Sequence, residues 1–500
     1  MQKLFFQLFL IIFFLFSVFT INAQTTRYVD GINGNNNGGS NDCSNSGSPC
    51  ATITHAVNMS DFGDIVRIAP AEYTEVLFID KSISLEGTDQ TNTIIQAHTQ
   101  PNQATNRVIT LSEFIEVTIS DVTIRHGNAT VGGGYPYKAG GGIYVQNASL
   151  TMFRVLFYRN KADQQGGGMS TRHSEVELNS VSFIENESNN DGGAIVNYNV
   201  VNQKLTNVSF INNSSISNGS GTISNTSNST IEIVNALFYG NTGASVAGCI
   251  VLDPTSSINV TNAVFYGNVC NSSSSSGVLS LFAGSGSIFT NTIFWENSGG
   301  TANDITVTQN TTAELYNCLY DNTDPNSIVV QGNGQFLCEN CVYNNPQFLD
   351  PQNLDFSLQE NSVAINAGDP DIDLTIFPVD EQNIPVDLAD NPRVVGGIID
   401  IGPYEFQGTN SINDFEVISN VKMFPNPVNN LLYINSGVEI KAITIYDIIG
   451  REVKAYDFRK KSSENLTKDY VIDFTDLFEN VYIIEIKSIT GVETYKIIKK

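Results

Sequence analysis

Side chains capable of acid–base chemistry gather in the first half of the chain. Eliminative cleavage of an acidic polysaccharide needs a cation to stabilise the developing charge, together with a base. Hydrolysis of a glycan instead needs two carboxyl groups at a fixed separation. The candidates for these roles are Arg154, Arg172, His173, Asp163 and Asp191. The alternative, which we favour, is that they are solvated surface residues, as most charged side chains are.

A second candidate site is a metal loop near the end of the first 400 residues. Asp369, Asp371 and Asp373 alternate as at the start of a calcium-binding loop, but the glycine and closing glutamate of an EF-hand are missing. Calcium is the one cofactor that this pattern suggests. The alternative is an acidic capping loop, and the sequence indicates no other cofactor.

The seven cysteines are typical of an exported chain with few crosslinks. Cys43 and Cys50 flank a loop rich in Ser, Asn, Gly and Pro, which a disulfide can close in an oxidising compartment. A lone CxxC lacks the further ligands that zinc needs, so a local disulfide involving Cys318 is the better interpretation. The sequence leaves open the partners of Cys249, Cys270, Cys318, Cys338 and Cys341.

An internal repeat must position these side chains. The string Phe-x-x-Asn recurs at intervals of about 27 residues, and Gly-rich turns followed by an aliphatic residue keep phase with it. The six copies begin at Phe157, Phe183, Phe210, Phe238, Phe265 and Phe294, and Leu319…Asn322 continues the series.

The period predicts the fold. Residues 176–183 alternate apolar and polar side chains, which indicates a strand with one buried face. Three short strands and three turns fill about 27 residues, one rung of a parallel β-helix. Leucine-rich repeats and WD40 blades do not fit the pattern or the period. We therefore predict a right-handed parallel β-helix with an inward Phe stack and a hydrogen-bonded Asn ladder at one bend.

Alternation along the strand after each Gly-rich turn predicts an outward face. On that face we expect Tyr144, Tyr198 and Phe282, which suit stacking on a sugar ring or packing. We also expect Asp163 and Asp191 to occupy equivalent turns one rung apart. If the cations and carboxylates converge in one groove, catalysis is favoured.

The charge balance limits the partners. The chain carries 51 Asp and Glu against 25 Lys and Arg, a formal net charge of −26, and residues 205–392 contain no Lys or Arg. Nucleic acid is not an expected partner, because binding phosphates requires clustered cations. An acidic polysaccharide would have to bind the early rungs.

The first residues predict export. Lys3 precedes an apolar run over 4–19, and Ala23 offers a small residue for cleavage, as in a secretory signal peptide. The alternative is a membrane anchor, but the run is short for a bilayer span. We expect no transmembrane segment in the mature chain.

The repeats and their flanks resemble known families. The Gly-Gly-Gly-Ile and Ser-Phe-x-x-Asn rungs are similar to the pectin-lyase-like β-helix superfamily. Residues 27–30 and 63–73 resemble the opening of the choice-of-anchor Q family, and 348–351, 355–358, 362–368 and 391–406 resemble its closing segment. The resemblance implies a secreted β-helix with a variable anchor and no settled activity.

The last 80 residues look like another module. Strand-like runs over 431–434, 442–446, 482–486 and 495–498 predict a small immunoglobulin-like sandwich. The region resembles a type IX secretion C-terminal sorting domain of type A, although Asn480-Val481 replaces its usual glycine. The resemblance implies a sorting signal at Pro425, Asn426, Pro427, Gly450, Lys496, Lys499 and Lys500. The alternative is an ordinary immunoglobulin-like module.

These patterns divide the chain into successive parts. They are a signal peptide (1–23), a cap and first rungs (24–110), β-helix repeats (111–350), a closing segment (351–410), a linker (411–420) and a sorting domain (421–500). We expect delivery through the periplasm by the type IX machinery to the outer surface or the medium. Two function classes remain: a non-catalytic glycan-binding or adhesive protein, and a polysaccharide lyase or glycoside hydrolase.

Overall fold

The chain divides into two compact units, Met1–Gln407 and Gly408–Lys500. The computed structural model describes residues 24–132, 137–282, 284–408, 422–436, 440–447, 451–458, 469–478, 480–488 and 492–500. The predicted signal peptide, residues 1–23, and the predicted linker, 411–420, lie outside this part. Among the described residues, no helix combines the length and apolar character needed to cross a bilayer.

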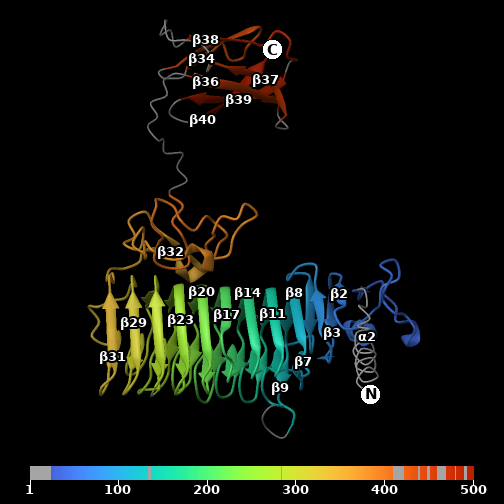
Figure 1. The fold of residues 1–500 in the computed structure, drawn as a ribbon, viewed down its shortest axis with the longest axis vertical. Helices are drawn as coiled ribbons and strands as arrows, with labels where there is room; N and C mark the ends of the chain where they lie inside the picture. The colour runs from blue at the N-terminus through green and yellow to red at the C-terminus, as the bar shows by residue number, and fades with distance from the viewer. Residues whose placement is uncertain are drawn as a thin grey trace, which may run out of the picture. The chain divides into compact units, whose positions relative to one another are not determined.

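The first unit is the predicted parallel β-helix, in which successive rungs add one strand to each of three parallel sheets (Figure 1). The long sheet contains β1 (Thr26–Val29), β2 (Ile65–Ile68), β3 (Ala71–Thr74), β5 (Ile83–Glu86), β6 (Thr93–Gln96), β8 (Glu116–Arg125), β11 (Ser149–Tyr158), β14 (Glu175–Ile184), β17 (Gln203–Ile211), β20 (Thr230–Tyr239), β23 (Ser257–Tyr266), β26 (Gly286–Thr290), β27 (Ile293–Trp295), β29 (Thr312–Tyr316) and β31 (Gln335–Glu339).

The second sheet is formed by the strands that follow the Gly-rich turns. It contains β4 (Leu77–Ile79), β7 (Ile109–Leu111), β10 (Ile143–Gln146), β13 (Met169–Arg172), β16 (Ile195–Tyr198), β19 (Ile223–Thr226), β22 (Ile250–Leu252), β25 (Leu279–Leu281), β28 (Ile305–Val307) and β30 (Ile328–Val330). The third sheet contains two-residue strands: β9 (Asn128–Ala129), β12 (Lys161–Ala162), β15 (Glu187–Ser188), β18 (Ser214–Ser215), β21 (Thr242–Gly243) and β24 (Val269–Cys270).

The predicted Phe stack fills the interior. Phe157, Phe183, Phe210, Phe238, Phe265 and Phe294 are all buried. Neighbouring rings are stacked with centroid separations of 4.7, 5.2, 4.7, 4.3 and 5.3 Å. A Cβ on Gly142 would lie 2.8 Å from the ring of Phe157, so the glycine leaves space for the ring. This contact explains why the two sequence markers keep phase.

The predicted Asn ladder is also present. Each buried Asn donates its side-chain N–H to the side-chain oxygen of the Asn one rung later, as Asn186 does to Asn213 at 3.0 Å and Asn241 to Asn268 at 2.9 Å. The second N–H of the same amide bonds the carbonyl of the Phe in the preceding rung, as Asn186 does to Phe157 at 3.0 Å. Pairing of this kind removes the cost of burying an amide.

The seventh repeat differs from the prediction. Leu319 pairs with Ile293 rather than Phe294, so its side chain joins an outer cluster, and Asn322 is exposed. A slip of one residue moves a strand side chain to the other face. The ladder ends instead on Asp304, whose carboxylate accepts from the Asn297 amide at 2.9 Å.

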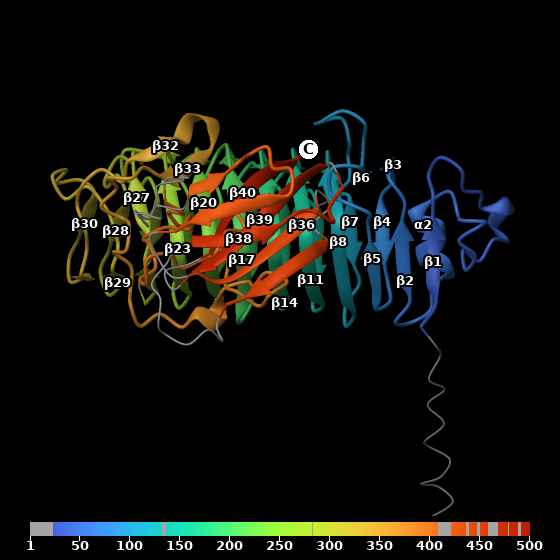
Figure 2. The same cartoon turned by 90° about the horizontal axis from the view of Figure 1, so that it is seen from above.

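A short helix covers the start of the β-helix (Figure 2). Helix α2 (Ile53–Met59) buries Ile53, Ala56 and Val57, and the loop before it contains η1 (Asn37–Gly39). The carboxylate of Glu75 accepts the N–H groups of Ile53 and Thr54 at 2.9 and 2.8 Å. An acid at this end satisfies amides that have no partner within the helix.

The predicted closing segment lies against the side of the β-helix. We call residues 345–407 the lateral segment; it contains β32 (Phe348–Asp350), β33 (Asp355–Leu358), η2 (Pro351–Asn353) and η3 (Leu374–Ile376). Phe356 packs with the outward side chains of Val264 and Ile293. In Figure 1 the segment passes over the late rungs, beside β20 and β23.

A second set of asparagines attaches this segment. The long strands bend at residues with positive φ, and in the later rungs these are Asn207, Asn235, Asn262, Asn291 and Asn317. Asn tolerates this conformation better than most residues do. Asn262 donates to the carbonyls of Asp400 and Gly402 at 3.0 and 2.8 Å. This set was not predicted, although an Asn stands three residues before several of the Phe residues in the sequence.

The end of the lateral segment buries four charged groups. Asp387, Arg393, Asp400 and Glu405 are at most 4% exposed. The carboxylates accept backbone N–H groups, and Arg393 donates to the Asp400 and Gly402 carbonyls at 3.1 and 2.6 Å. Burial raises the pKa of Glu405 to about 7 and also raises that of Asp400. The predicted closing motif is therefore a buried polar network.

The second unit is the predicted sandwich. One antiparallel sheet contains β34 (Lys422–Phe424), β35 (Leu431–Asn435) and β38 (Asp469–Asp473), and the other β37 (Glu452–Asp457), β36 (Ile440–Asp447), β39 (Asn480–Ser488) and β40 (Val492–Lys499). Leu432, Ile443, Ile472 and Ile484 share one buried core. This unit has its own core, as independent domains do.

Candidate functional site

Several cations of the early rungs form ion pairs between rungs. Arg154 donates to Asp121 through Nε and Nη2 at 2.6 and 2.9 Å, and Arg159 donates to Glu185 at 2.6 Å. Lys161 pairs with Glu187, its neighbour in the parallel register. These cations are therefore neutralised one by one and do not converge in a shared groove.

Arg172 and His173 come together with a predicted binding residue. The Arg172 guanidinium lies 4.3 Å from the ring centroid of Tyr198, and His173 contacts the same ring edge-on at 5.8 Å. The Asn199 amide lies 2.7 Å from Nδ1 of His173. Arg154 belongs to another strand, at the bend of β11, with Asp121 as its partner. The structure thus brings Arg172 and His173 together, apart from the pair that Arg154 makes.

Asp163 and Asp191 do not occupy equivalent positions. The register pairs Lys161 with Glu187, which places Asp163 opposite Asn189 rather than Asp191. Asp163 accepts from Lys138 at 2.6 Å and from Asn189 at 2.8 Å. The sequence comparison was wrong by two residues, because the rungs repeat here every 26 residues whereas Asp163 and Asp191 are 28 residues apart.

A different carboxyl pair lies near this face. Burial raises the pKa of Asp191 and of Asp253, and the charge of Asp191 raises the latter further. Gln165 donates to Asp191 at 3.3 Å. Asp253 directly follows β22 in the position that Tyr198 occupies in β16. Of these two residues, only Asp191 was predicted from the sequence.

The predicted aromatic face is partly covered. Tyr144 is only 5% exposed, whereas Tyr198 and Phe282 are 37% and 42% exposed. Each Gly-rich turn folds back over the next strand: a Cβ on Gly192 would lie 2.5 Å from Val196. The Tyr144 ring lies beneath the Arg107 guanidinium at 4.6 Å. Alternation predicted exposure because it takes no account of this turn.

The predicted calcium loop does not gather its carboxylates. Among the described residues, the only His, Cys, Asp or Glu group with three ligand atoms mutually within 4.8 Å is Cys43, Cys50 and His55. Asp373 accepts the Thr375 N–H at 2.9 Å and Asp369 that of Asp371 at 3.0 Å. The loop is attached to the β-helix, because Asn291 accepts the Asp369 N–H at 2.7 Å.

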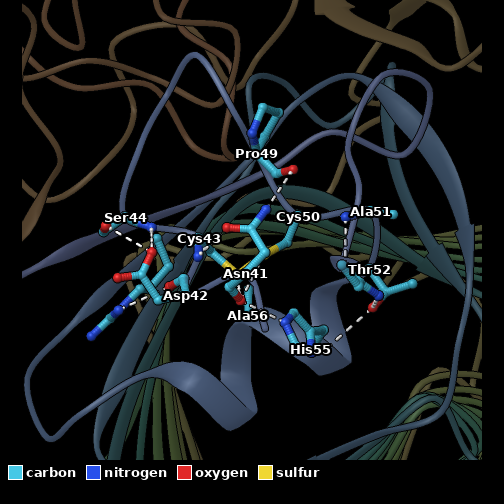
Figure 3. Close-up of a disulfide and its surroundings, with 12 residues drawn as sticks. Asn41, Asp42, Cys43, Ser44, Pro49, Cys50, Ala51, Thr52, His55 and Ala56 are labelled. Atoms are coloured by element: carbon cyan, nitrogen blue, oxygen red, sulfur yellow. Dashed lines mark hydrogen bonds between the residues drawn. A yellow bond between two sulfur atoms is a disulfide. The ribbon is translucent and has the colours of Figure 1, made fainter. Parts of the chain in front are cut away.

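Two disulfides are present. Cys43 is bonded to Cys50 as predicted, and Nε2 of His55 lies 2.7 Å from the Asn41 carbonyl beside it (Figure 3). With both sulfurs bonded to each other, this group is not a metal site. Cys338 is bonded to Cys341, whereas Cys318 is a free, buried thiol. The predicted involvement of Cys318 is therefore wrong; Cys249 and Cys270 are also free and buried.

A groove that the sequence analysis missed lies beside the late rungs. Two cavities of about 260 and 370 Å³ share Trp295, Glu296 and Asn345 in their linings. The residue after each inward Phe must point outward. Aromatic residues at three of these positions, Tyr239, Tyr266 and Trp295, could therefore have predicted an outward aromatic row. These three residues are neighbours across adjacent strands.

Several of the predicted sorting residues lie where the segment around Asn426 is hydrogen-bonded to the last strand. Asn426 donates to the Lys496 carbonyl and accepts the Ile498 N–H, both at 3.0 Å. The Lys500 N–H donates to the Val428 carbonyl at 2.9 Å. The Pro425–Pro427 segment thus holds the last strand, which includes Lys499. Gly450 lies outside the described residues.

Comparisons with known proteins bear on both units. Residues 422–500 match a family model described as Secretion system C-terminal sorting domain. A search of curated proteins returns no match. The match does not extend to residues 27–406, where the resemblance to choice-of-anchor Q stays a prediction.

Several solved structures resemble the β-helix at low identity. The pectate lyase Pel9A has a TM-score of 0.37 and 14% identity, covering 77% of this chain and 98% of that one. A rhamnogalacturonan lyase has a TM-score of 0.29 and 13% identity, with 65% and 90% covered. The pectin methylesterase from Aspergillus niger has a TM-score of 0.27 and 14% identity, with 71% and 95% covered. Such distant likeness carries no argument about activity.

Proposed function

We propose that this is an exported β-helix protein that binds glycans lacking acidic groups, without cleaving them. The observation that carries this proposal is the pairing of the early-rung cations: Arg154, Arg159 and Lys161 each have a carboxylate of a neighbouring rung as partner. A lyase needs a cation directed at its substrate instead. The exposed Tyr198 and Phe282 rings suit sugar stacking.

The sorting domain supports delivery through type IX secretion. The domain at 422–500 implies the secretion machinery as a partner and either release or attachment at the cell surface. A resemblance to choice-of-anchor Q supports the same picture of a displayed β-helix. We expect deletion of residues 422–500 to leave a folded β-helix in the periplasm, because each unit has its own core. Normal surface levels of the truncated chain would refute the assignment.

The binding function is tested with the full exported protein on a glycan array, followed by product assays on every hit. We expect hits without acidic groups and no products. A polyanion would bind through the early rungs, weaken as salt rises and lose binding in the Arg154→Ala/Arg172→Ala double variant. Release of unsaturated products from a polyuronate would overturn the proposal in favour of a lyase.

Glycoside hydrolysis is a second candidate, supported by Asp191 and Asp253. Both are half-buried beside strands of the second sheet, Asp191 before β16 and Asp253 after β22, and burial raises the pKa of each, as it does for many catalytic acids. Hydrolysis of a bound glycan that is lost in both Asp191→Asn and Asp253→Asn, with binding retained, would support this function. Unchanged product formation in either variant would exclude the pair.

A further inference from the structure

The groove beside the late rungs is bounded by two walls. We call the joined cavities the Trp295 groove. One wall comes from β23 and β27, through Tyr266, Trp295 and Glu296, and the other from Asn345 to Gln359 of the lateral segment. The turns around Asp304 and Asp324 complete it. The combined volume is in the range of small-ligand sites, roughly 300–1,000 Å³.

An aromatic wall runs along this groove. Trp295 lies opposite Tyr266 in the register, about 4.8 Å away along the axis. Phe356 and Phe348 contact the Tyr266 ring at centroid distances of 5.3 and 5.9 Å, which hold it in place. Trp295 itself is only half-buried. A half-buried ring that lines a groove suits a flat apolar partner such as a pyranose face.

The polar lining carries one sign of charge. The groove is lined by the carboxyl groups of Glu296, Asp304, Asp321 and Asp324, together with several side-chain amides. All lining residues fall within 205–392, where the sequence has no Lys or Arg. Such a field repels anionic ligands and attracts cationic ones, in agreement with the net charge of −26.

The carboxyl groups differ in their surroundings. Asp304 is buried and accepts from Asn297 and Ser327, and burial raises its pKa to about 6. Hydrogen bonds from Thr323 hold the pKa of Asp321 below its usual value. Asp324 accepts the Asn326 N–H at 2.8 Å and a side-chain N–H of Asn303. Glu296 is exposed and accepts from the Tyr266 hydroxyl.

The carboxylates are too dispersed to share one small ion. In the described part of the chain, no three of these carboxyl groups have ligand atoms mutually within 4.8 Å. A metal ion needs several oxygens around one point. Dispersed acids beside an aromatic ring suit an extended ligand with positive charges along it, since cations bind both carboxylates and ring faces.

We propose that the Trp295 groove binds an oligosaccharide of amino sugars with free, protonated amines, with a pyranose face on Trp295 and ammonium groups directed at Glu296 and Asp324. This rests on the proposed glycan-binding function and names its ligand class. The lateral segment contributes to the site, since the side chains of Asn345, Gln347 and Gln359 line it.

Fluorescence of the full-length protein tests this directly, because Trp295 is the only tryptophan in the chain. Titration with a glucosamine tetramer should change the emission saturably. We expect binding about tenfold tighter than that of the N-acetylated tetramer, weakening as salt rises. Asp324→Asn and Glu296→Gln should each weaken binding several-fold, whereas Glu381→Gln, an exposed acid outside the groove, should not.

Each contrary outcome has a distinct meaning. Equal affinity for the N-acetylated tetramer would show that the amine is not recognised and overturn the proposal. Glycan binding that leaves the emission unchanged and depends on Tyr198 or Phe282 would refute the groove while keeping the proposed function. No binding of any glycan would refute both. A lysine peptide that binds more tightly than the sugar, with the same response and variants, would replace the glycan with a basic protein segment.

Discussion

The early and late rungs share one interior but carry different residues at the outer bend of the long strands. In the early rungs the bend residues are Asp121, Arg154 and Ser180, and the first two pair with each other in solvent. In the late rungs they are asparagines, and Asn262 and Asn291 bond the lateral segment. The same backbone turn therefore serves as free surface in one region and as an attachment line in the other.

This difference separates stability from function in the repeat. The stack and the ladder need only identical inward residues, which both regions have. What varies is the outward row, where a charge keeps the bend in water and an amide allows another segment to cover it. The late rungs form one side of a groove because the lateral segment is attached beside them.

The largest effect on the unfolding free energy is expected from substitutions in the shared interior. Phe183→Ala in the early rungs and Phe238→Ala in the late rungs should each lower the unfolding free energy by about 3–5 kcal/mol, because each removes a ring stacked between two others. Chemical denaturation measures both. Phe282→Ala, on an exposed ring, should change it by less than about 0.5 kcal/mol. A neutral Phe238→Ala would refute the shared stack.

Exchanging bend residues tests the attachment line. Asn262→Arg should lower stability by about 2–3 kcal/mol, because it leaves the Asp400 and Gly402 carbonyls without this donor and places a charge in a buried site. Limited proteolysis should then cut the lateral segment faster. The reciprocal Arg154→Asn should change stability by less than about 1 kcal/mol. Equal effects of the two exchanges would remove the distinction between the regions.

The pH dependence of the unfolding free energy should arise in the late rungs and the lateral segment. Because burial raises the pKa of Glu405 to about 7, the folded state binds its proton more tightly than the unfolded chain. The stabilisation is complete below the unfolded value and is lost as pH rises through about 7. Burial raises the pKa of Asp304 to about 6, so its stabilisation is likewise lost as pH rises through that value. Denaturation between about pH 5 and 8 should show falling stability, with a smaller slope in Asp304→Asn. A rise over this range would contradict the assignment.

The smallest effect should come from the surface ion pair. A double-mutant cycle on Arg154 and Asp121 should give a coupling energy of about 0.2–1 kcal/mol, because the Arg154 side chain is largely exposed and salt screens it. High salt should reduce this coupling further. A coupling above about 2 kcal/mol would indicate that the early bend is as important as the late one.

The sequence by itself determined the repeating part of this protein. A Phe and an Asn at fixed spacing, in phase with glycines, can be satisfied together only if successive copies stack, so the β-helix, the Phe stack and the Asn ladder followed from local pattern. The same holds for the sandwich, whose strands alternate. The Cys43–Cys50 bond followed from proximity in the chain.

Tertiary structure decided everything that depends on contacts between distant segments. Tyr144 alternates as an outward residue, yet it is 5% exposed and its ring lies beneath the guanidinium of Arg107, which precedes it by 37 residues. Leu319 continued the spacing, but parallel pairing with Ile293 set it one residue out of phase. The Trp295 groove exists because residues 345–359 return beside strands formed about 50 to 90 residues earlier. Periodicity reports which side of a strand a residue occupies, whereas only the folded chain reports what covers that side.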